Sequence, residues 1–418
     1  MQVEPQWLFR QAEERDRTAF LNLSRLAFMP QTPLAELEQH FATQPLNPPE
    51  RVGWVVADAT GAIAARMQEL QFQTWFLGVP FPLAGVAGVA VALERRGQGV
   101  ARWMLEQGIR EWRSRQMPLS MLYPFRHSFY RRLGWATVGH HQQFRVATQH
   151  LPLYPERQHI HAYQAADRAA LEALYADVAP KHNGWLHRAD GQWTEFLTVR
   201  GGREIYTYMD EGQLAGYVVL EFKQPPWSDR QWVVVVQEWV ARSPAAYRGL
   251  VGFVASLRDQ IAIAVWNTDR EDPFPHLVLE QRSAPPRPSP ETEFGYLHQF
   301  GAIGGGFMWR LIDWQSALTL RPIQPGPAFA LTLEVHDPVL GTETATIECA
   351  DGQMQLSQKP AATTVQLSID QLTTLFAAER SPVTMHWTGE LAVTGPEAVL
   401  QDWAIAWKTN PLFCWDFF

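Results

Sequence analysis

The sequence predicts three consecutive folded regions of the α/β and α+β classes, built on mixed β-sheets. With 418 residues the chain is long enough for two or three domains with ample cores. Two successive stretches show a similar order of elements, with three strands before a long helix and a further strand. Pro152, Pro155 and the Pro-rich residues 283–290 interrupt this pattern, and shorter strands and helices follow. We therefore expect domains over residues 1–150, 151–295 and 296–418.

Composition favours a globular protein. Hydrophobic residues make up 46% of the chain and charged residues 19%, the opposite of the balance that keeps a chain disordered. The net charge of −8 argues against nucleic acid as a partner. Cys349 and Cys414 have neither the spacing of a zinc site nor that of a disulfide framework, which fits a reducing cytoplasm. The first 20 residues lack an apolar signal core, and the longest apolar run, residues 81–93, is too short for a bilayer. We expect a cytoplasmic protein with no membrane partner.

Apolar periodicity and turn residues predict the elements of the first region in order. They are helices over 16–28 and 34–41, strands over 51–57 and 63–72 joined by a turn at 58–61, a turn at 79–82, an apolar strand from 86, a helix from 100, a strand and a short aromatic helix before 135, and a closing strand over 138–146.

The turn between the apolar strand and its helix has the residues of an anion site. Gly97 and Gly99 let the backbone approach a ligand closely, and the helix that follows begins with unpaired N–H groups. Arg95 and Arg96 add positive charge, so the turn suits a pyrophosphate. It is neither a dinucleotide fingerprint, because Arg102 stands where the third glycine would be, nor a P-loop, because no G-K-[ST] follows.

The second and third regions show no comparable loop. The predicted elements of the second region are a helix over 167–178, strands over 204–209, 213–222 and 231–241, and a helix over 244–260. Residues 283–290 read as a linker, Gly304 to Gly306 as a flexible turn, and residues 308–313 as the opening of the third region. The third region is predicted to be α+β, with strands over 329–336, 343–349, 353–356, 364–368 and 391–394 and helices over 369–378 and 396–407.

The first region resembles the GNAT N-acetyltransferases. Arg96, Gly99 and Ala101 match the R/Q-x-x-G-x-G/A loop of that family, and residues 128–135 (SFYRRLGW) match the element whose tyrosine lies near the coenzyme sulfur. The resemblance implies acetyl-CoA as co-substrate and Tyr130 at the reacting sulfur. It also implies a coenzyme site formed by the strand and the loop, comprising Val89, Ala90, Val91, Arg95, Arg96, Gly97, Gln98, Gly99, Val100 and Ala101.

The whole chain resembles the enhanced intracellular survival (Eis) acetyltransferases. The features that carry this resemblance are one unit with the loop, a second unit without it, a third region that starts M-W-R-L-I-D, and an aromatic C-terminus. The resemblance implies two fused GNAT domains followed by a domain like sterol carrier proteins, assembly as a hexamer, and acetylation of amines, including those of aminoglycosides. It also implies Tyr130 as general acid and the C-terminal carboxylate of Phe418 as general base. Phe125 departs from members that carry a small residue such as serine there, which puts the shape of the acyl pocket or substrate channel in doubt.

An amine acceptor sets a requirement on the base. The amine arrives protonated and must lose a proton before it attacks. An α-carboxyl group with a pKa of ~3.5 is a weak base unless aromatic neighbours such as Phe413, Trp415 and Phe417 desolvate it. Backbone N–H groups around Val91 would polarise the thioester carbonyl. Two alternatives stay open: a protein that senses acetyl-CoA or binds lipid without turnover, and an acetyltransferase that acts on protein lysines.

The sequence predicts no metal site. His140 and His141, and His159 and His161, have no third ligand at a useful spacing. No G-x-S-x-G motif of a serine hydrolase is present. The expected partners are therefore acetyl-CoA and a small-molecule amine.

Overall fold

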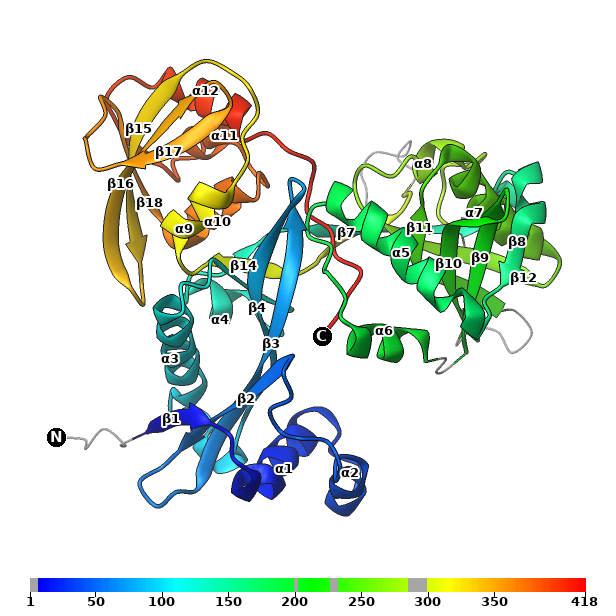
Figure 1. The fold of residues 1–418 in the computed structure, drawn as a ribbon, viewed down its shortest axis with the longest axis horizontal. Helices are drawn as coiled ribbons and strands as arrows, with labels where there is room; N and C mark the ends of the chain where they lie inside the picture. The colour runs from blue at the N-terminus through cyan, green and yellow to red at the C-terminus, as the bar shows by residue number, and fades with distance from the viewer. Residues whose placement is uncertain (1–6, 199–201, 226–231, 285–298) are drawn as a thin grey trace.

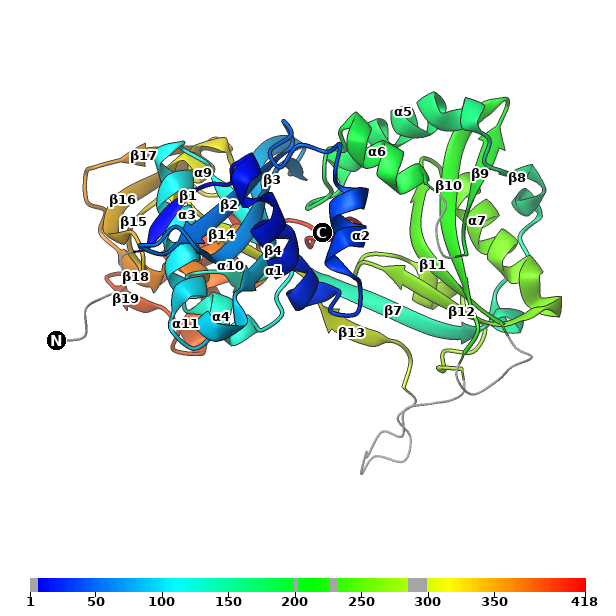
Figure 2. The same ribbon diagram turned by 90° about the horizontal axis from the view of Figure 1, so that it is seen from below.

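The protein is organised around three β-sheets. The computed structural model describes residues 7–198, 202–225, 232–284 and 299–418. Figures 1 and 2 show three bodies, with the C-terminal segment ending among them. Two of the sheets have seven strands and the third has five, and each contains both parallel and antiparallel pairs. The predicted class of mixed-sheet α/β and α+β domains is confirmed. No helix in the described ranges has the length and apolar character needed to cross a membrane.

The first sheet has helices on both faces. Its strands, in spatial order, are β1 (Leu8–Gln11), β2 (Arg51–Ala57), β3 (Ile63–Phe76), β4 (Val79–Val91), β5 (Leu119–Leu122), β14 (Met308–Leu311) and β6 (Ala136–Thr137). Its helices are α1 (Arg17–Phe28), α2 (Leu34–His40), α3 (Val100–Ser114) and α4 (His127–Arg131). Alternation along β3 separates the faces: Arg66 lies on the Phe20 ring of α1, whereas Met67 points at Gly108 of α3.

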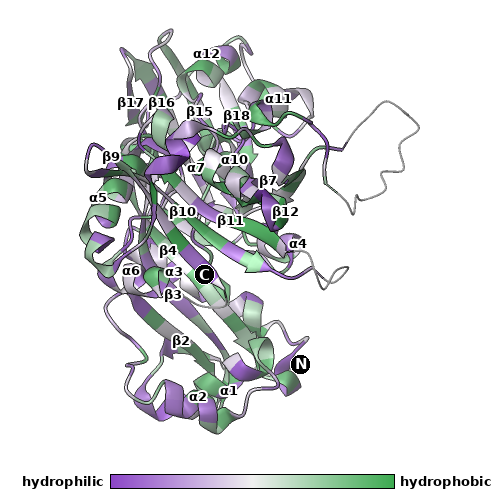
Figure 3. Ribbon diagram, turned by 90° about the vertical axis from the view of Figure 1, so that its right-hand side faces the viewer, coloured by the Kyte–Doolittle hydropathy of each residue, from purple (hydrophilic) through white to green (hydrophobic). Residues whose placement is uncertain are grey.

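The second sheet is buried on both faces. Its strands, in spatial order, are β13 (Ala302–Gly305), β7 (His140–Ala147), β12 (Ile261–Thr268), β11 (Trp232–Ala241), β10 (Gln213–Lys223), β9 (Arg203–Asp210) and β8 (Ile160–Ala162). In β10, Val218 and Leu220 pack in the cluster of α7 (Pro244–Ser256), while Tyr217 and Val219 pack with α5 (Arg168–Val178). Burial on both faces explains the continuous apolar run of this strand and the apolar colour of β10 and β11 in Figure 3. The remaining helices of this body are α6 (Asp190–Leu197) and α8 (Phe274–Leu277).

Two strands cross between the bodies, which the sequence analysis did not foresee. The predicted closing strand of the first region is β7, and it lies in the second sheet between β13 and β12. The segment predicted to open the third region contains β14, which completes the first sheet between β5 and β6. Both predictions of sheet membership are wrong, because apolar periodicity identifies a strand but carries no information on a partner some 190 residues away. Figure 2 shows β7 running from the first body into the second.

The third body is a five-stranded sheet covered by helices. Its strands, in spatial order, are β17 (Gln353–Ser357), β16 (Gly341–Ala350), β15 (Phe329–Asp337), β18 (Thr364–Ser368) and β19 (Ala392–Thr394). The helices are α9 (Trp314–Leu320), α10 (Ile369–Phe376), α11 (Pro382–Trp387) and α12 (Val399–Ala406). Its core includes the fully buried Trp403 and Phe376, so the α+β prediction for this region is confirmed.

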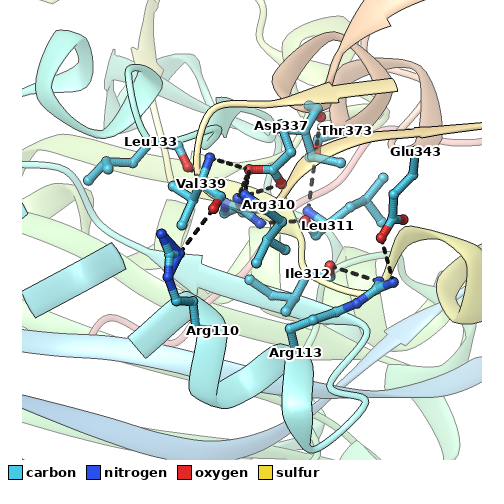
Figure 4. A network of polar contacts seen from close by, with 12 residues as sticks. Arg110, Arg113, Leu133, Arg310, Leu311, Ile312, Asp337, Val339, Glu343 and Thr373 are labelled. Carbon is cyan, nitrogen blue, oxygen red and sulfur yellow. Dashed lines mark hydrogen bonds and ion pairs between the residues drawn. The ribbon is translucent and has the colours of Figure 1, made fainter. Parts of the chain in front are cut away.

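Arg310 joins β14 to the third body. Its side chain is fully buried and forms a bidentate pair with Asp337, at 2.7 and 2.8 Å, as Figure 4 shows. The same guanidinium donates to the carbonyl oxygens of Leu133 and Leu311. At the edge of this network, Arg113 of α3 pairs with Glu343 at 2.8 Å. Because every charged group here has a partner, the junction between the first and third bodies is specific.

Two local predictions are also wrong. Residues 79–82 form the start of β4 and not a turn; Pro80 and Pro82 are tolerated because pairing with β5 begins only at Leu83. Residues 304 and 305 belong to β13 and pair with His141 and His140, where a flexible turn was expected. Most of the predicted linker, residues 285–290, and position 231 lie outside the described residues.

Candidate active site

β4 has a free edge next to its bulge. It pairs with β3 along nearly its whole length, but with β5 only from Leu83 to Val86. The register against β3 shifts between Arg66 and Gln68, and Gly88 has a φ of +56°. No strand in the described ranges pairs with the β5 side of β4 beyond Val86. The backbone groups of residues 87–91, which include Val89, Ala90 and Val91, can therefore bind an extended ligand there.

The loop after β4 exposes the N-terminus of α3. Gly97 and Gly99 have φ values of +77° and +80°, and a Cβ at either would meet nothing within 4 Å. Gly99 precedes the first residue of α3 and supplies no side-chain cap, so the first N–H groups of the helix are open. The Val100 side chain is buried and Ala101 is half-buried, which leaves their backbone N–H groups as the polar atoms facing the loop. This backbone can bind a phosphate group.

The two arginines of the loop differ in their partners. Arg95 forms an ion pair with Asp58 at 2.7 Å and lies against the Trp7 ring. Arg96 is exposed and makes no ion pair with any residue in the described ranges. The Gln98 side chain donates to the Glu94 carbonyl. Arg96 is thus the loop side chain with an uncommitted charge.

Tyr130 lies in α4 in an aromatic cluster. Its ring is 4% exposed and contacts Phe125, Phe129 and Trp135 at centroid distances of 5.5, 5.0 and 6.0 Å. Its hydroxyl makes no hydrogen bond within the part of the chain that the structure describes. Burial raises the pKa of Tyr130 above its usual value of 10, so the phenol is protonated at neutral pH. Phe125, in contrast, is exposed.

The last ten residues form a tail that docks between the bodies. Asn183 anchors its start: the side chain donates to Thr409 and to the carbonyl of Asn410, and its oxygen accepts from the Leu77 N–H. The N–H of Phe413 donates to the Asn183 carbonyl at 2.9 Å. Figure 1 shows the tail passing between the β3–β4 hairpin and the second body.

A buried ion cluster holds the next part of the tail. Arg188 donates to Asp416 at 2.7 Å and forms a bidentate pair with Glu238 at 2.6 and 2.9 Å. Tyr217 donates to the same Glu238 carboxylate. Burial raises the pKa of Asp416, and the charge of Arg188 opposes that shift. Since Arg188 is almost fully buried, the two carboxylates that pair with it offset the cost of burying its charge.

The end of the tail reaches the place where β4 and β5 separate. Tyr123, the residue after the last one paired in β5, donates to the Asp416 carbonyl at 2.8 Å. The Phe418 ring contacts Tyr123 at 5.5 Å and Phe72 of β3 at 4.9 Å. Phe417 contacts Tyr123 as well, although it is 80% exposed. The C-terminal residue therefore lies beside the end of β5, near the point where β4 and β5 separate.

A cavity of about 640 Å³ lies around the tail. We call it the tail cavity. It is lined by residues of β2, β3, α6, β9, β10 and β11, by residues of the loops before β2 and α6, and by the tail from Trp415 to Phe418. Its charged lining residues are Glu50, Arg51, Arg188, Glu195, Arg203, Glu221, Glu238 and Asp416. The lining contains five carboxylates and three arginines, so its net negative charge favours a cationic ligand.

The predicted site residues lie in two groups. Residues 89–91 and 95–101 lie along β4 and its loop, and Tyr130 and Phe418 lie against the aromatic residues that follow β5. Asn183, Arg188 and Tyr123 also belong to the site, although no motif in the sequence points to them. The one available signal in the sequence was the glycine at position 184. The structure shows why glycine stands there: its φ is +92°, and a Cβ would meet the Phe413 carbonyl oxygen at 2.5 Å.

The histidine pairs form no metal site in the described ranges, where no group of three or more potential ligands occurs. The His141 ring contacts the Phe413 ring at a centroid distance of 4.6 Å, and burial lowers the pKa of His141. His140 pairs with Glu379 at 3.1 Å. Both therefore have structural contacts.

Three family models match the chain. An acetyltransferase (GNAT) domain model matches residues 9–138, a second acetyltransferase (GNAT) domain model matches residues 184–311, and a sterol carrier protein domain model matches residues 314–415. No curated protein matches. The chain thus consists of two GNAT domains and a C-terminal domain like sterol carrier proteins, and it is a transferase. GNAT domains use acetyl-CoA as co-substrate.

Solved structures with the same fold match over the whole chain. A GCN5-related N-acetyltransferase from Anabaena variabilis has a TM-score of 0.83 at 20% identity, covering 99% of this chain and 100% of its own. One from Kribbella flavida has a TM-score of 0.79 at 24% identity, covering 100% and 99%. Eis1 from Mycobacterium abscessus has a TM-score of 0.77 at 19% identity, covering 99% and 100%. At these identities the likeness concerns the fold.

Proposed function

We propose that this GNAT-domain transferase moves acetyl from acetyl-CoA to a primary amine, with aminoglycoside-like or other polyamine acceptors. Tyr130 is the general acid, and the C-terminal carboxylate of Phe418 is the general base. One observation carries the proposal: the tail is fastened so that Phe418 contacts Tyr123, at the point where β4 and β5 part. An aromatic tail with no function would need only burial, yet Phe417 is exposed and the hydrogen bonds fix the backbone.

The co-substrate binds along β4 and its loop. The backbone of Val89, Ala90 and Val91 hydrogen-bonds the extended arm of the coenzyme, and backbone N–H groups near Val91 polarise the thioester carbonyl. The loop residues from Gly97 to Ala101 bind the pyrophosphate through the α3 N-terminus, with Arg96 adding charge-assisted hydrogen bonds. Arg95, which pairs with Asp58, orders the loop.

The chain's own groups handle two protons. The Phe418 carboxylate accepts the proton of the incoming ammonium group, directly or through water. The freed amine forms its C–N bond as the C–S bond breaks, its second surplus proton passes to solvent water, and the thiolate leaves toward Tyr130, which regains from water any proton that it gives up. Since burial raises the pKa of Tyr130, this phenol stabilises the thiolate first by a hydrogen bond and gives up its proton late.

The tail cavity is the proposed acceptor site. The carboxylates of Glu50 and Glu195 attract a cationic amine, whereas Glu221 already pairs with Lys223. We further propose that the enzyme acts in the cytoplasm and binds neither nucleic acid nor a membrane. The resemblance to the Eis acetyltransferases suggests a homo-oligomer, namely a hexamer. Sedimentation velocity measures this oligomeric state.

A thiol-release assay tests the proposed function. Acetyl-CoA is incubated with the enzyme and with an aminoglycoside, a polyamine or a lysine peptide. Release of free CoA that depends on the amine is the expected result, and the best acceptor separates small amines from protein lysines. Acetyl-CoA binding without turnover on any amine would instead support a sensor or lipid-binding protein.

Tyr130→Phe tests the acid. Loss of one hydroxyl leaves the ring packing in place, so kcat should fall about 100-fold or more while the Kd for acetyl-CoA stays near that of the unmodified enzyme. Phe129→Leu, which changes a neighbour of Tyr130 that has no hydroxyl, is the control. An unchanged kcat in Tyr130→Phe would remove Tyr130 from the mechanism.

A further inference from the structure

A second cavity lies beside the β4 bulge. It measures about 230 Å³ and is lined by α1, α2, the segment after α2, and β2, β3 and β4 of the first sheet. We call it the bulge cavity. Gly88, Phe20, Phe28, Phe41, Arg51 and Arg66 are among its lining residues. No carboxylate lines it among the described residues, in contrast to the tail cavity.

Arg66 is a buried cation in this cavity without an acidic partner. It is 3% exposed, and its guanidinium lies 3.9 Å from the centroid of the Phe20 ring. One terminal nitrogen donates to the Ser24 hydroxyl at 2.9 Å. Its Nε is buried with no hydrogen-bond partner in the described ranges. A buried guanidinium with an orphaned donor is costly unless a ligand completes it.

The other deeply buried arginines are satisfied. Arg188 and Arg310 each form a bidentate pair with a carboxylate. Arg321 has no acid beside it, but its nitrogens donate to the carbonyl oxygens of Phe376, Pro322 and Trp407. Arg66 has neither a paired carboxylate nor a set of carbonyl acceptors, so its hydrogen bonds are less complete than those of the other three arginines.

Arg51 adds a second cation to the bulge cavity. Its Nε is also buried with no partner in the described ranges. Burial, together with the charge of Arg51, lowers the pKa of Arg66 to about 9, which still leaves Arg66 protonated at pH 7. Arg51 and Gln44 line both cavities, so a ligand in the tail cavity can extend to these arginines.

The bulge brings the Arg66 guanidinium against β4. A Cβ on Gly88 would meet a terminal nitrogen of Arg66 at 2.6 Å, and Arg66 pairs across the sheet with Ala90. The cation therefore lies next to the strand segment proposed to hold the thioester. It is distinct from the loop of Gly97 and Gly99, where the pyrophosphate is proposed to bind.

We infer that Arg66 and Arg51 bind a carboxylate carried by the acceptor, so that the acceptor is an amine with its own carboxylate, such as an amino acid. This inference rests on the proposed acetyl transfer to a primary amine, and it favours acceptors with a carboxylate over aminoglycosides and polyamines, which have none. Guanidinium groups recognise carboxylates by paired, charge-assisted hydrogen bonds. The carboxylates of the tail cavity receive the ammonium end of the same molecule.

Paired acceptors test the inference. Acetyl transfer is measured by CoA release for phenylalanine against phenylalaninamide and for lysine against lysinamide, with a polyamine as a reference. The carboxylate member of each pair should have a kcat/KM at least about ten-fold higher. In Arg51→Gln and Arg66→Gln this ratio should fall to near one, while Arg270→Gln, which removes an exposed charge of the second body, keeps it.

Calorimetric titration of phenylalanine in the absence of acetyl-CoA gives a second readout. Binding should weaken at least about ten-fold in Arg51→Gln, a half-buried position that can be changed without emptying the core.

Acetylation of the polyamine with no preference for a carboxylate would overturn this inference and leave the proposed function standing. If the enzyme preferred succinyl-CoA over acetyl-CoA but did not prefer acceptors with a carboxylate, the two arginines would bind the acyl group and not the acceptor, and the inference would be wrong. No CoA release with any amine would overturn the proposed function itself.

Discussion

Gly88 connects the coenzyme edge of β4 with the buried cation of Arg66. Its φ of +56° is in the region that residues with a Cβ avoid, and the guanidinium occupies the space where a Cβ would point. Glycine is therefore needed at position 88 for two reasons: the backbone has a positive φ, and the Arg66 guanidinium leaves no room for a Cβ. The sequence offered only a glycine in an apolar strand, which is compatible with a bulge but does not reveal what lies above it.

Gly88→Ala tests this double requirement against Gly61→Ala. Gly61, in the β2–β3 turn, has a φ of +85° and open space around its Cβ position. Both variants should lose about 1–2 kcal/mol of unfolding free energy, measured by urea titration, because both force a positive φ on alanine. Only Gly88→Ala should also lower kcat, by about ten- to a hundred-fold, through displacement of Arg66 and the β4 edge. Equal kcat in the two variants would contradict the role given to the bulge.

At the scale of elements, the β4–loop–α3 unit was predictable because its signals are local. The glycines, the arginines and the amphipathic helix lie within about 30 residues, and the structure has the loop where the pattern requires it. The pairing of Arg95 with Asp58 was not predictable, because it joins the loop to a turn 37 residues earlier. That pairing leaves the two loop arginines in different roles.

Arg96→Gln tests the loop as an anion-binding element. Loss of the uncommitted charge should weaken acetyl-CoA binding about ten-fold in a calorimetric titration, with little change in kcat at saturation. Arg102→Gln is the matched control, since Arg102 is an exposed α3 residue paired with Glu106. Unweakened binding in Arg96→Gln would mean that the backbone alone holds the pyrophosphate.

Local sequence patterns cannot predict that β7 pairs in the second sheet and β14 in the first. Each strand was predicted as a strand or an opening segment, yet each pairs in a sheet other than the expected one. The decisive contacts are those of Arg310 with Leu133 and Asp337, and of β14 with β5. A buried arginine in an apolar strand was the available signal, but its partners could not be read from spacing. The boundaries at residues 150 and 295 stay predictions.

At the scale of the whole molecule, the three bodies meet at the tail. Asn183 of the second body binds Leu77 of the first and Thr409 and Asn410 at the end of the third. Arg188 then joins Asp416 to Glu238. The aromatic composition of the tail predicted that it would dock, but not where, because its partners lie more than 200 residues away.

Asn183→Ala tests whether the bodies hold the tail in its working position. The variant removes three hydrogen bonds and leaves the Leu77 N–H unpaired, which should cost about 1–3 kcal/mol of stability. We expect kcat to fall at least ten-fold with acetyl-CoA affinity unchanged, because β4 and its loop are untouched. Asn267→Ala removes comparable bonds inside the second sheet and should spare kcat. If both variants behaved alike, the anchoring role of Asn183 would be wrong.

The most direct test of the central claim replaces the α-carboxylate of Phe418 by a carboxamide, using ligation of a synthetic tail. The amide keeps the ring contacts with Phe72 and Tyr123 but cannot act as a base at neutral pH. We predict a kcat at least 100-fold below that of protein ligated with the native acid, with the same Kd for acetyl-CoA. Equal kcat in the two ligated proteins would contradict it.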